Sequence, residues 1–331
     1  MNTPFLTIAI PTYKRPNRLN DLLQVIAKQK MVNNEEWEVL ISDNHSCDTT
    51  ASIVESYAQV IPNLVYVQQA ENIGPDRNIW FLFQKARGEF VWLMPDDDNF
   101  ADLMSVREVI DELNHAPLKP AFAIVNASAV ELDTGIVIRE RLHPVEHNVF
   151  FFDGRDILSV LSDIDLITGL RLIIRKDTIN IEFSKNYYET SLLTPLAVSI
   201  GSCAAGSAMI IGKSFAKLGL GDQSVWRSYW SKLCLQDMPD LLLDARDTLG
   251  YSSEIIKNII EGRKQIEINK NINPIKLSFQ LYGLSWRKLS RLYGRKYITL
   301  LVLKNFIKLF YYIPYRAEKE IVKYLRRKIH K

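Results

Sequence analysis

Cysteine and glycine are scarce in this sequence, and each shortage excludes a class of site. The 331 residues include three cysteines, Cys47, Cys203 and Cys234, which are too few and too widely spaced for a disulfide framework or a CxxC metal site. The first hundred residues contain only Gly74 and Gly88. They therefore hold neither a GxGxxG dinucleotide-binding turn nor a glycine-rich phosphate-binding loop. The beginning of the sequence also lacks the basic and apolar segments of a secretory signal, so we expect a reducing, cytoplasmic compartment.

The net charge of +3 is small, but the charges are unevenly distributed along the chain. Residues 285–331 hold fourteen Lys or Arg and two acids, a net charge of +12, so the first 284 residues carry a net charge of −9. Lys304 and Lys308 interrupt the apolar run of this segment, which makes it a poor membrane span. Its mixture of basic and apolar residues favours an amphipathic segment lying on an anionic membrane surface over a nucleic-acid-binding tail. The alternative is a helix packed on the rest of the protein with a solvated basic face.

Short apolar runs alternate with amphipathic, helix-like segments through the first hundred residues. The expected strands are residues 5–10, 37–42, 64–68 and 89–94. This alternation predicts βαβ crossovers and an α/β fold, in which a mostly parallel, Rossmann-like sheet has helices on both faces. The first strand is expected to stop at Pro11.

The later part of the chain has a less regular pattern. A helix is expected over residues 103–114, a strand over 121–126 and a hairpin near 130–139. Residues 150–218 give no clear assignment, and the pattern is helical from Gly219 onward.

Polar residues follow three of the predicted strands, at the edge where parallel α/β sheets bind ligands. They are Thr12 to Arg15, Asp43 with Asn44, and the acidic run Asp96–Asp98. Three adjacent carboxylates repel one another, and no glycine-rich loop is present to bind phosphates. A bound Mg2+ or Mn2+ would relieve the repulsion and stabilise a departing diphosphate. The alternative is a solvated acidic turn.

Other polar residues near these strand ends suit a nucleotide. Asp43 is placed to accept hydrogen bonds from a base and Tyr13 to stack on it, although a helix cap and a partly buried aromatic ring are the simpler roles. Arg77 is placed to reach a phosphate, or to pair with Asp76 in the first turn of a helix.

Four segments together carry a family resemblance. Residues 8–15 (IAIPTYKR), 41–48 (ISDNHSCD), 72–74 (NIG) and 92–98 (WLMPDDD) resemble, in order and spacing, the signatures of family 2 glycosyltransferases with the GT-A fold. The stretch 74–78 (GPDRN) is similar to bacterial enzymes that build surface polysaccharides such as lipopolysaccharide O-antigen, including abequosyltransferase-like members. The resemblance implies an inverting transfer of a sugar from a nucleotide diphosphate sugar to an acceptor hydroxyl.

The resemblance also assigns roles to individual residues. Thr12, Tyr13 and Asp43 would hold the base, and Asp98 would be the main metal ligand of a DxD-type motif, assisted by Asp96. The implied donor-site residues are Pro11, Thr12, Tyr13, Arg15, Asp43, Arg77, Asp96 and Asp97. Asn44 departs from the family's usual acid or glycine after the second strand, and the triple Asp leaves open whether Asp96 or Asp97 pairs with Asp98.

An inverting transferase needs a general base, usually a carboxylate. Glu189, in the segment 187–192 ahead of an apolar run, is the best match to the family's position. A plain helix-start acid is the alternative role. The competing carboxylates are those of Asp153, Asp163, Asp165 and Asp177. His143 and His147 suggest a zinc site only weakly, because Pro144 opposes a helix and a third ligand is not evident.

These observations predict a GT-A catalytic domain over residues 1–220, with a donor half (1–115) and an acceptor half (116–220), followed by a helical C-terminal region (221–331). The expected partners are a nucleotide diphosphate sugar, a saccharide or lipid-linked saccharide acceptor, and an anionic membrane surface that the basic tail contacts. The expected location is the inner face of a bacterial plasma membrane. A sugar nucleotidyltransferase is a weaker alternative, because residues 11–16 lack its glycine-rich loop; a membrane-associated scaffold with a degenerate donor site is another.

Overall fold

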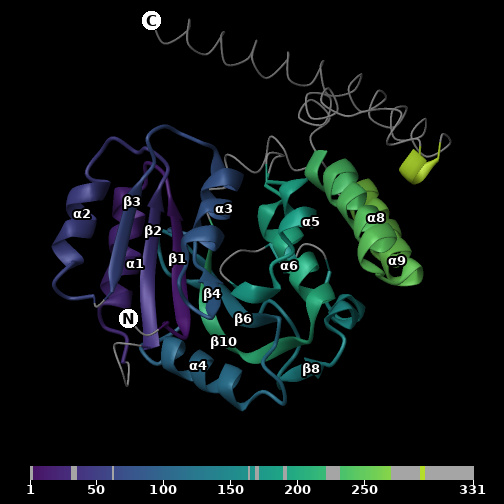
Figure 1. Ribbon diagram of the computed structural model, residues 1–331, viewed down its shortest axis with the longest axis horizontal. Coiled ribbons are helices and arrows are strands. Elements are labelled where there is room, and N and C mark those ends of the chain that lie inside the picture. Colours follow the sequence, from purple (N-terminus) through teal and green to yellow (C-terminus); the bar gives the residue numbers. More distant parts are fainter. Residues whose placement is uncertain are drawn as a thin grey trace, which may run out of the picture. The chain divides into compact units, whose positions relative to one another are not determined.

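The computed structural model describes residues 3–30, 36–61, 63–162, 165–167, 171–188, 192–220, 232–269 and 291–294. Contacts along the chain divide it into two compact units, Met1–Gln223 with Ala245–Ile255, and Ser224–Asp244 with Ile256–Lys331. The first unit contains the β-sheet (Figure 1). The division at residue 220 into a catalytic domain and a helical region stays a prediction.

The strands are β1 (Leu6–Thr12), β2 (Trp37–Asp43), β3 (Leu64–Gln68), β4 (Phe90–Leu93), β5 (Asn99–Phe100), β6 (Phe122–Glu131), β7 (Val137–Arg139), β8 (Val149–Phe151), β9 (Leu172–Arg175) and β10 (Ala208–Leu220). The α-helices are α1 (Pro16–Ile26), α2 (Thr50–Tyr57), α3 (Pro75–Lys85), α4 (Ser105–His115), α5 (Ile181–Lys185), α6 (Thr194–Ala205), α8 (Met238–Leu249) and α9 (Ser253–Asn269). Short helical turns are η2 (Gly154–Ser159), η3 (Asp165–Ile167), η5 (Lys176–Thr178) and the π-helical η6 (Leu233–Asp237).

The predicted α/β fold is confirmed. In the described residues the strands form one sheet in the order β3-β2-β1-β4-β9-β6-β10-β5, with β7 on β6 and β8 on β10. The four strands predicted from the first hundred residues pair in parallel, as do β6 and β10. Their carboxyl ends therefore meet at one edge of the sheet, where α/β proteins bind ligands. The predicted hairpin is also confirmed, because β7 pairs antiparallel with β6.

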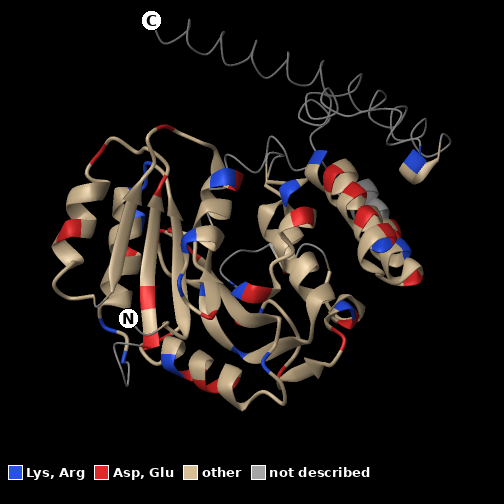
Figure 2. Cartoon of the chain, in the orientation of Figure 1, with Lys and Arg blue, Asp and Glu red and all other residues tan. Residues whose placement is uncertain are grey.

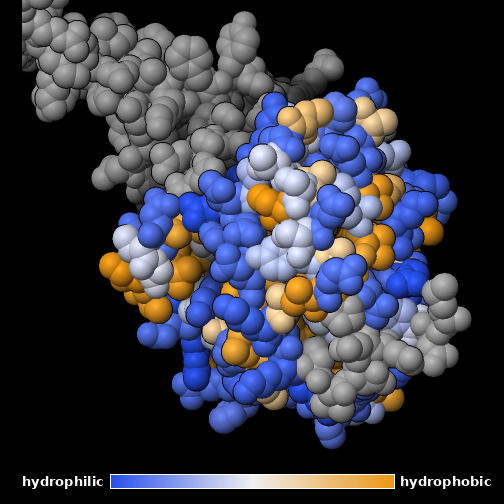
Figure 3. Space-filling view, turned by 90° about the vertical axis from the view of Figure 1, so that its left-hand side faces the viewer, coloured by the Kyte–Doolittle hydropathy of each residue, from blue (hydrophilic) through white to orange (hydrophobic). Residues whose placement is uncertain are grey.

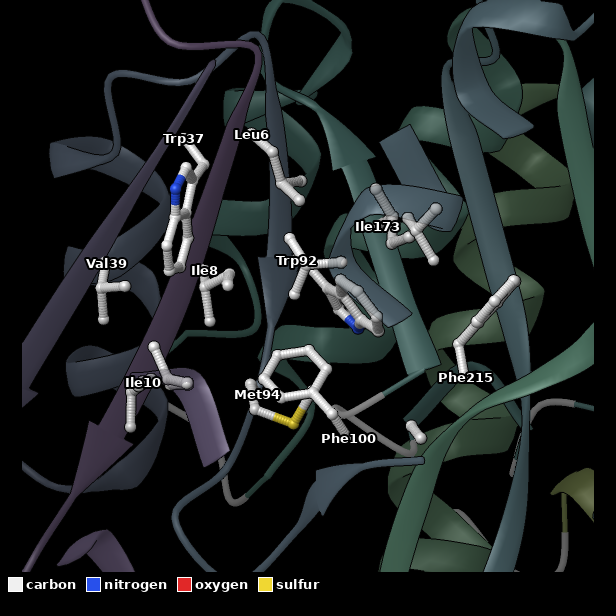
Figure 4. Close-up of a cluster of buried hydrophobic side chains, with 14 of the residues drawn as sticks. Leu6, Ile8, Ile10, Trp37, Val39, Trp92, Met94, Phe100, Ile173 and Phe215 are labelled. Atoms are coloured by element: carbon white, nitrogen blue, oxygen red, sulfur yellow. The ribbon is translucent and has the colours of Figure 1, made fainter. Parts of the chain in front are cut away.

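The sheet is held by an apolar core on the side of α1 and α4. Alternate residues of the central strands, among them Ile8, Val39 and Trp92, are fully buried in this cluster (Figure 4). Full burial of one such side chain stabilises the fold by about 1.5–3 kcal/mol. Figure 2 shows the strands almost entirely tan, with Lys, Arg, Asp and Glu mainly in loops and helices. The strand interiors thus provide the rigid frame, and the charged residues lie at its edges.

Two aromatic residues fix the short connection that contains the acidic run. Trp92 on β4 precedes Asp96–Asp98 and Phe100 on β5 follows it, and both rings are buried in the core. Their centroids lie 5.1 Å apart at 87°, an edge-to-face contact. The three aspartates are therefore tied to the core at both ends.

The first strand continues past Pro11 to Thr12, so the prediction that it stops at Pro11 is wrong. Proline lacks an N–H group, which usually excludes it from a central strand. The Ala9 carbonyl accepts the Met94 N–H group, and the Thr12 carbonyl accepts that of Asn44 on the other side. By this alternation Pro11 faces the β4 side, where β4 has already ended at Leu93. The missing N–H group therefore costs no sheet hydrogen bond.

The segment without a clear assignment contains β8, β9, α6 and β10. β9 pairs antiparallel with both β4 and β6, so a strand from late in the chain lies in the middle of the sheet. The helical pattern expected from Gly219 begins later, because β10 runs to Leu220, held by pairing with β6. Within the part of the chain that the structure describes, no helix has the length and apolarity needed to cross a membrane.

In the second unit, the described residues are helical apart from short connections and comprise η6, the first half of α8 and most of α9. Figure 2 shows both acidic and basic residues along these helices. The basic tail, residues 285–331, lies outside the described residues except for 291–294. The face seen in Figure 3 is mainly hydrophilic with small separate hydrophobic groups, as on an ordinary protein surface.

Candidate active site

The structure brings the end of β1 against the start of the acidic run. The Thr12 hydroxyl donates a hydrogen bond of 2.7 Å to Oδ2 of Asp96. Both residues are buried, with Asp96 only 4% exposed. β1 and β4 are parallel neighbours, so their carboxyl ends place these residues side by side. The sequence-predicted donor-site residues Thr12 and Asp96 are thus in direct contact.

Arg15 neutralises part of the acidic run. This residue immediately precedes α1, and its Nη1 atom lies 2.7 Å from Oδ2 of Asp97 and 3.3 Å from Oδ1 of Asp96. Burial, followed by the charge of Asp97, still raises the pKa of Asp96 to about 6. The same two causes raise the pKa of Asp98 well above its ordinary value. One guanidinium therefore does not fully offset the burial of Asp96 and Asp98.

Asp98 faces a different element from its two neighbours. Its Oδ1 atom accepts the Gly219 N–H group of β10 at 3.0 Å, and the residue is 7% exposed. A Cβ atom at Gly219 would lie 2.2 Å from the carbonyl oxygen of Asp97. Glycine is therefore required here for the close approach of β10 to the acidic run. Asp96 and Asp97 face Arg15, whereas Asp98 faces β10, so the contacts do not select one pair.

The donor set suits a hard divalent cation. Buried, mutually repelling carboxylate oxygens are the ligands that Mg2+ and Mn2+ take in proteins. The described residues contain no group of three or more His, Cys, Asp or Glu arranged as a complete metal site. An incomplete set fits a cation that completes its coordination with water and substrate phosphates, as Mg2+ commonly does.

Asp43 is fully buried at the end of β2, and both its carboxylate oxygens accept hydrogen bonds from protein. The N–H group and the hydroxyl of Ser46 donate to Oδ1 at 2.9 and 2.5 Å. The Tyr66 hydroxyl donates to Oδ2 at 2.7 Å. Burial and the bond to Asp43 raise the pKa of Tyr66 above its ordinary value. The carboxylate is thus held rigidly, and its predicted contact with a base would share oxygens that already have partners.

The loops after β1 and β2 are tied together. The Lys14 N–H group donates to the Ser46 hydroxyl oxygen at 2.8 Å. Lys14 and His45 both have positive φ angles, 53° and 66°, an uncommon conformation for residues other than glycine. Next to this link Tyr13 is 38% exposed, with the Lys14 ammonium 5.2 Å from its ring centroid. Its ring is available for stacking at the carboxyl edge.

Asn44, the departure from the family pattern, connects to the loop before α3. Its side-chain amide donates to Oδ1 of Asn72 at 2.9 Å, and its Oδ1 atom accepts the Ile73 N–H group at 2.8 Å. An ionised acid at this position could only accept hydrogen bonds, whereas the asparagine amide donates one and accepts another. Arg77, in the first turn of α3, is exposed at the same edge.

Glu189 lies outside the described residues, but both flanks of its segment are attached to α3. The Tyr188 ring stacks on Trp80, with centroids 5.9 Å apart and planes at 14°. The buried Asp76 carboxylate accepts the N–H groups of Leu192 and Thr194, the latter at 3.0 Å. Asp76 and Trp80 are one helical turn apart and share a face of α3. Burial raises the pKa of Asp76 to about 6 despite these bonds.

Two of the competing carboxylates lie at the opposite, amino edge of the sheet. Asp177 follows the end of β9, which pairs with the start of β4. Asp153 follows β8, which pairs with the start of β10. Each is in an ion pair of 2.7 Å, with Arg175 and Arg155 respectively, and the bond to Arg155 lowers the pKa of Asp153.

Asp165 is bound by other side chains, and Asp163 lies outside the described residues. His143 Nε2 lies 2.8 Å from Oδ1 of Asp165, and Arg171 Nη1 lies 3.3 Å from the same oxygen. Although burial opposes ionisation, these partners lower the pKa of Asp165 to about 2. So low a pKa makes a weak general base. His143 thus pairs with a carboxylate.

Sequence reasoning missed four residues that support the site: Ser46, Tyr66, Asp76 and Gly219. A local signal existed for Ser46, because Asp and Ser three residues apart commonly form side-chain to backbone hydrogen bonds. Tyr66, Asp76 and Gly219 act on residues far away in the chain, and nothing in their neighbourhood indicates it.

Comparison with known proteins agrees with this geometry. Residues 7–178, more than half of the chain, match the family description Glycosyl transferase family 2. The chain is 33% identical to abequosyltransferase RfbV of Salmonella typhimurium over 97 residues. This stretch makes up 29% of each protein. It spans less than a third of the length of the curated relatives it matches.

Solved structures share the fold at low identity. Staphylococcus aureus TarS residues 1–349 in complex with UDP superposes with a TM-score of 0.57 at 15% identity, covering 86% of this chain and 77% of that one. The mannosyltransferase PcManGT of Pyrobaculum calidifontis, in complex with GDP-Man and Mn2+, has a TM-score of 0.50 at 14% identity, covering 92% and 88%. The resemblance to GT-A enzymes and to abequosyltransferases is confirmed, and the chain belongs to glycosyl transferase family 2.

Proposed function

We propose that this protein transfers a sugar from a nucleotide diphosphate sugar to an acceptor hydroxyl, with inversion and with the help of a divalent cation. The contact of Thr12 and Arg15 with the acidic run carries the proposal, because it joins two strand ends around Asp96 and Asp97. Structural neighbours bind UDP, or GDP-Man with Mn2+. The intact acidic run also favours an enzyme over a scaffold with a degenerate site.

Each residue of the proposed donor site has a role that matches its position. Tyr13 stacks on the base near Asp43, Pro11 lines the same edge, and Arg77 reaches the diphosphate from the first turn of α3. Asp98, with Asp96 or Asp97, would hold the cation, which would act as a Lewis acid toward the departing diphosphate. Thr12 keeps Asp96 oriented through its 2.7 Å hydrogen bond.

The reaction needs a base on the face of the sugar opposite the diphosphate. Glu189 accepts the proton of the acceptor hydroxyl while the hydroxyl oxygen bonds to the anomeric carbon and the bond to the diphosphate breaks. The attachment of Tyr188 and Leu192 to α3 supports this assignment, because α3 begins at the carboxyl edge of the sheet. Asp153 and Asp177 lie at the other edge, and Asp165 is held by His143 and Arg171.

For the acceptor we propose a lipid-linked or surface saccharide. The similarity to abequosyltransferase RfbV supports a bacterial polysaccharide. The net charge of +12 over residues 285–331 supports peripheral binding to an anionic membrane, since each basic residue near such a surface contributes about 1 kcal/mol. The proposed location is the inner face of the plasma membrane.

Thermal unfolding of the full chain with nucleoside diphosphates tests the donor site. UDP, GDP, CDP and dTDP are each added with Mn2+ or with EDTA. We expect one nucleotide with Mn2+ to raise Tm, because a ligand at a hundred times its Kd stabilises by about 2.7 kcal/mol. Asp98→Asn should lose this shift.

Asp133→Asn is the matched control, because Asp133 is an exposed acid in an ion pair with Arg18, outside the acidic run. Equal shifts in EDTA, or a normal shift in Asp98→Asn, would contradict the metal-dependent donor site. The nucleotide sugar that carries the nucleobase selected in this way is then tested for hydrolysis. Mn2+-dependent hydrolysis would distinguish an enzyme from a scaffold.

A further inference from the structure

A single nitrogen of Arg15 contacts two carboxylates of the acidic run. Nη1 lies 2.7 Å from Asp97 and 3.3 Å from Asp96, so the guanidinium meets oxygens that a divalent cation would also need. The Asp96 side chain is buried, whereas those of Arg15 and Asp97 are 30% and 25% exposed. The Arg15 side chain therefore has solvent beside it into which it can move. The Asp96 carboxylate, which Arg15 contacts through Oδ1, is held by Thr12 through its other oxygen, Oδ2.

A guanidinium and a divalent cation that approach the same carboxylate oxygens compete for them. Both are positive, and their repulsion is strong in a partly buried site of low effective dielectric constant. A cation that binds Oδ1 of Asp96 or Oδ2 of Asp97 therefore competes with Arg15. A displaced, buried or half-buried charge needs a new anionic partner.

We propose that Arg15 is the internal counter-ion of the acidic run and that it exchanges Asp96 and Asp97 for the diphosphate of the donor when the cation binds. This inference rests on the proposed metal-dependent donor site. Arg15 immediately precedes α1 at the carboxyl edge of the sheet, so its backbone stays fixed while the side chain changes partner. The exchange makes cation and nucleotide bind cooperatively. The cation releases Arg15 from the carboxylates, and the diphosphate gives the released guanidinium an anionic partner.

The exchange has an unusual consequence for a variant that loses the arginine. Without nucleotide, Arg15→Gln should bind Mn2+ about tenfold more tightly than the wild-type protein, because no internal cation competes. With nucleotide, the affinity of the wild-type protein for Mn2+ should rise, whereas that of the variant should rise much less, because no Arg15 is present to exchange partners. Coupling between two ligands is reciprocal, so Mn2+ should also raise the nucleotide affinity of the variant less. A residue that only bound the diphosphate would leave the affinity for Mn2+ alone unchanged.

The experiment measures free Mn2+ by electron paramagnetic resonance during titration of the full chain. The titration is run with and without the nucleoside diphosphate that raises Tm in the unfolding panel. Arg15→Lys keeps the charge and should keep the wild-type Mn2+ affinity without nucleotide. Arg18→Gln is the matched control: Arg18 lies in α1, is exposed to the same degree, and pairs with Asp133 instead of the acidic run.

Tighter Mn2+ binding by Arg15→Gln but not by Arg18→Gln or Arg15→Lys supports the exchange. Unchanged or weaker binding by Arg15→Gln, or equal tightening in Arg18→Gln, would overturn it and leave the donor site intact. Absence of Mn2+ binding by the wild-type protein, with and without nucleotide, would overturn the metal-dependent donor site itself. The two failures are therefore distinguishable.

Discussion

Replacement of Asp76 by alanine should destabilise the protein more than an ordinary loss of a helix cap. The buried carboxylate accepts the N–H groups of Leu192 and Thr194 at the start of α6. Loss of a capping side chain costs about 1 kcal/mol, and buried N–H groups left without acceptors add about 1–3 kcal/mol. We expect the free energy of unfolding to fall by about 2–4 kcal/mol at pH 8, and Tm to fall by roughly 4–16 °C.

The same change should be more severe at lower pH. The pKa of Asp76 is about 6 in the folded protein, above the 3.8 of a solvated aspartate, so between these values the folded state binds more protons. The stability that this group contributes is therefore lost as pH rises through 6. One pKa unit corresponds to about 1.36 kcal/mol. Asp76→Ala should thus cost roughly 1.4 kcal/mol more at pH 5 than at pH 8.

Urea unfolding followed by far-ultraviolet circular dichroism at both pH values measures this difference. Other buried acids such as Asp96 are present in both proteins, so their titration cancels. Asp102→Ala is the control, because exposed Asp102 accepts the Met104 N–H group beside the start of α4 and water can replace it. The reasoning is refuted if Asp76→Ala costs no more than Asp102→Ala, or if its cost at pH 5 is smaller than at pH 8.

Three further predictions concern the general base, Gly219 and the basic segment 285–331. Glu189→Gln should keep the nucleotide-dependent Tm shift and lose roughly 10²–10⁴-fold in transfer rate; near-normal transfer would place the base elsewhere. Gly219→Ala should lose the Mn2+-dependent nucleotide shift, since its Cβ would lie 2.2 Å from the Asp97 carbonyl oxygen, whereas Gly262→Ala, with no atom within 4 Å, should not. Neutralisation of basic residues in the 285–331 segment to glutamine should abolish flotation with anionic liposomes at low salt, and unchanged flotation would exclude this segment as the membrane contact.

The first half of the fold was predictable from the sequence because its signals are local. Buried strands such as Trp37–Asp43 alternate with amphipathic helices, and consecutive strands pair in parallel with their neighbours. β9 could not be predicted in the same way. It has four residues, and its place between β4 and β6 is decided by strands distant in the sequence.

The site divides in the same manner. The positions of Asp43 and of the acidic run at strand ends were predictable, because parallel strands bring their carboxyl ends together. The contacts that orient the side chains were not. Thr12 and Asp96 are 84 residues apart, and Asp76 and Thr194 are 118 apart, so only the folded chain brings each pair into contact.

The central position of β9 has a consequence for the order in which the protein can assemble. β4 emerges from the ribosome roughly 80 residues before β9, and at about 5–20 residues per second the delay lasts several seconds. During this time β1 covers one side of β4 while the other side presents unpaired backbone groups, an exposed edge that can pair with another chain. Nascent chains on neighbouring ribosomes are therefore prone to associate at β4, and a fragment that ends after α4 should aggregate under conditions that keep the full chain in solution.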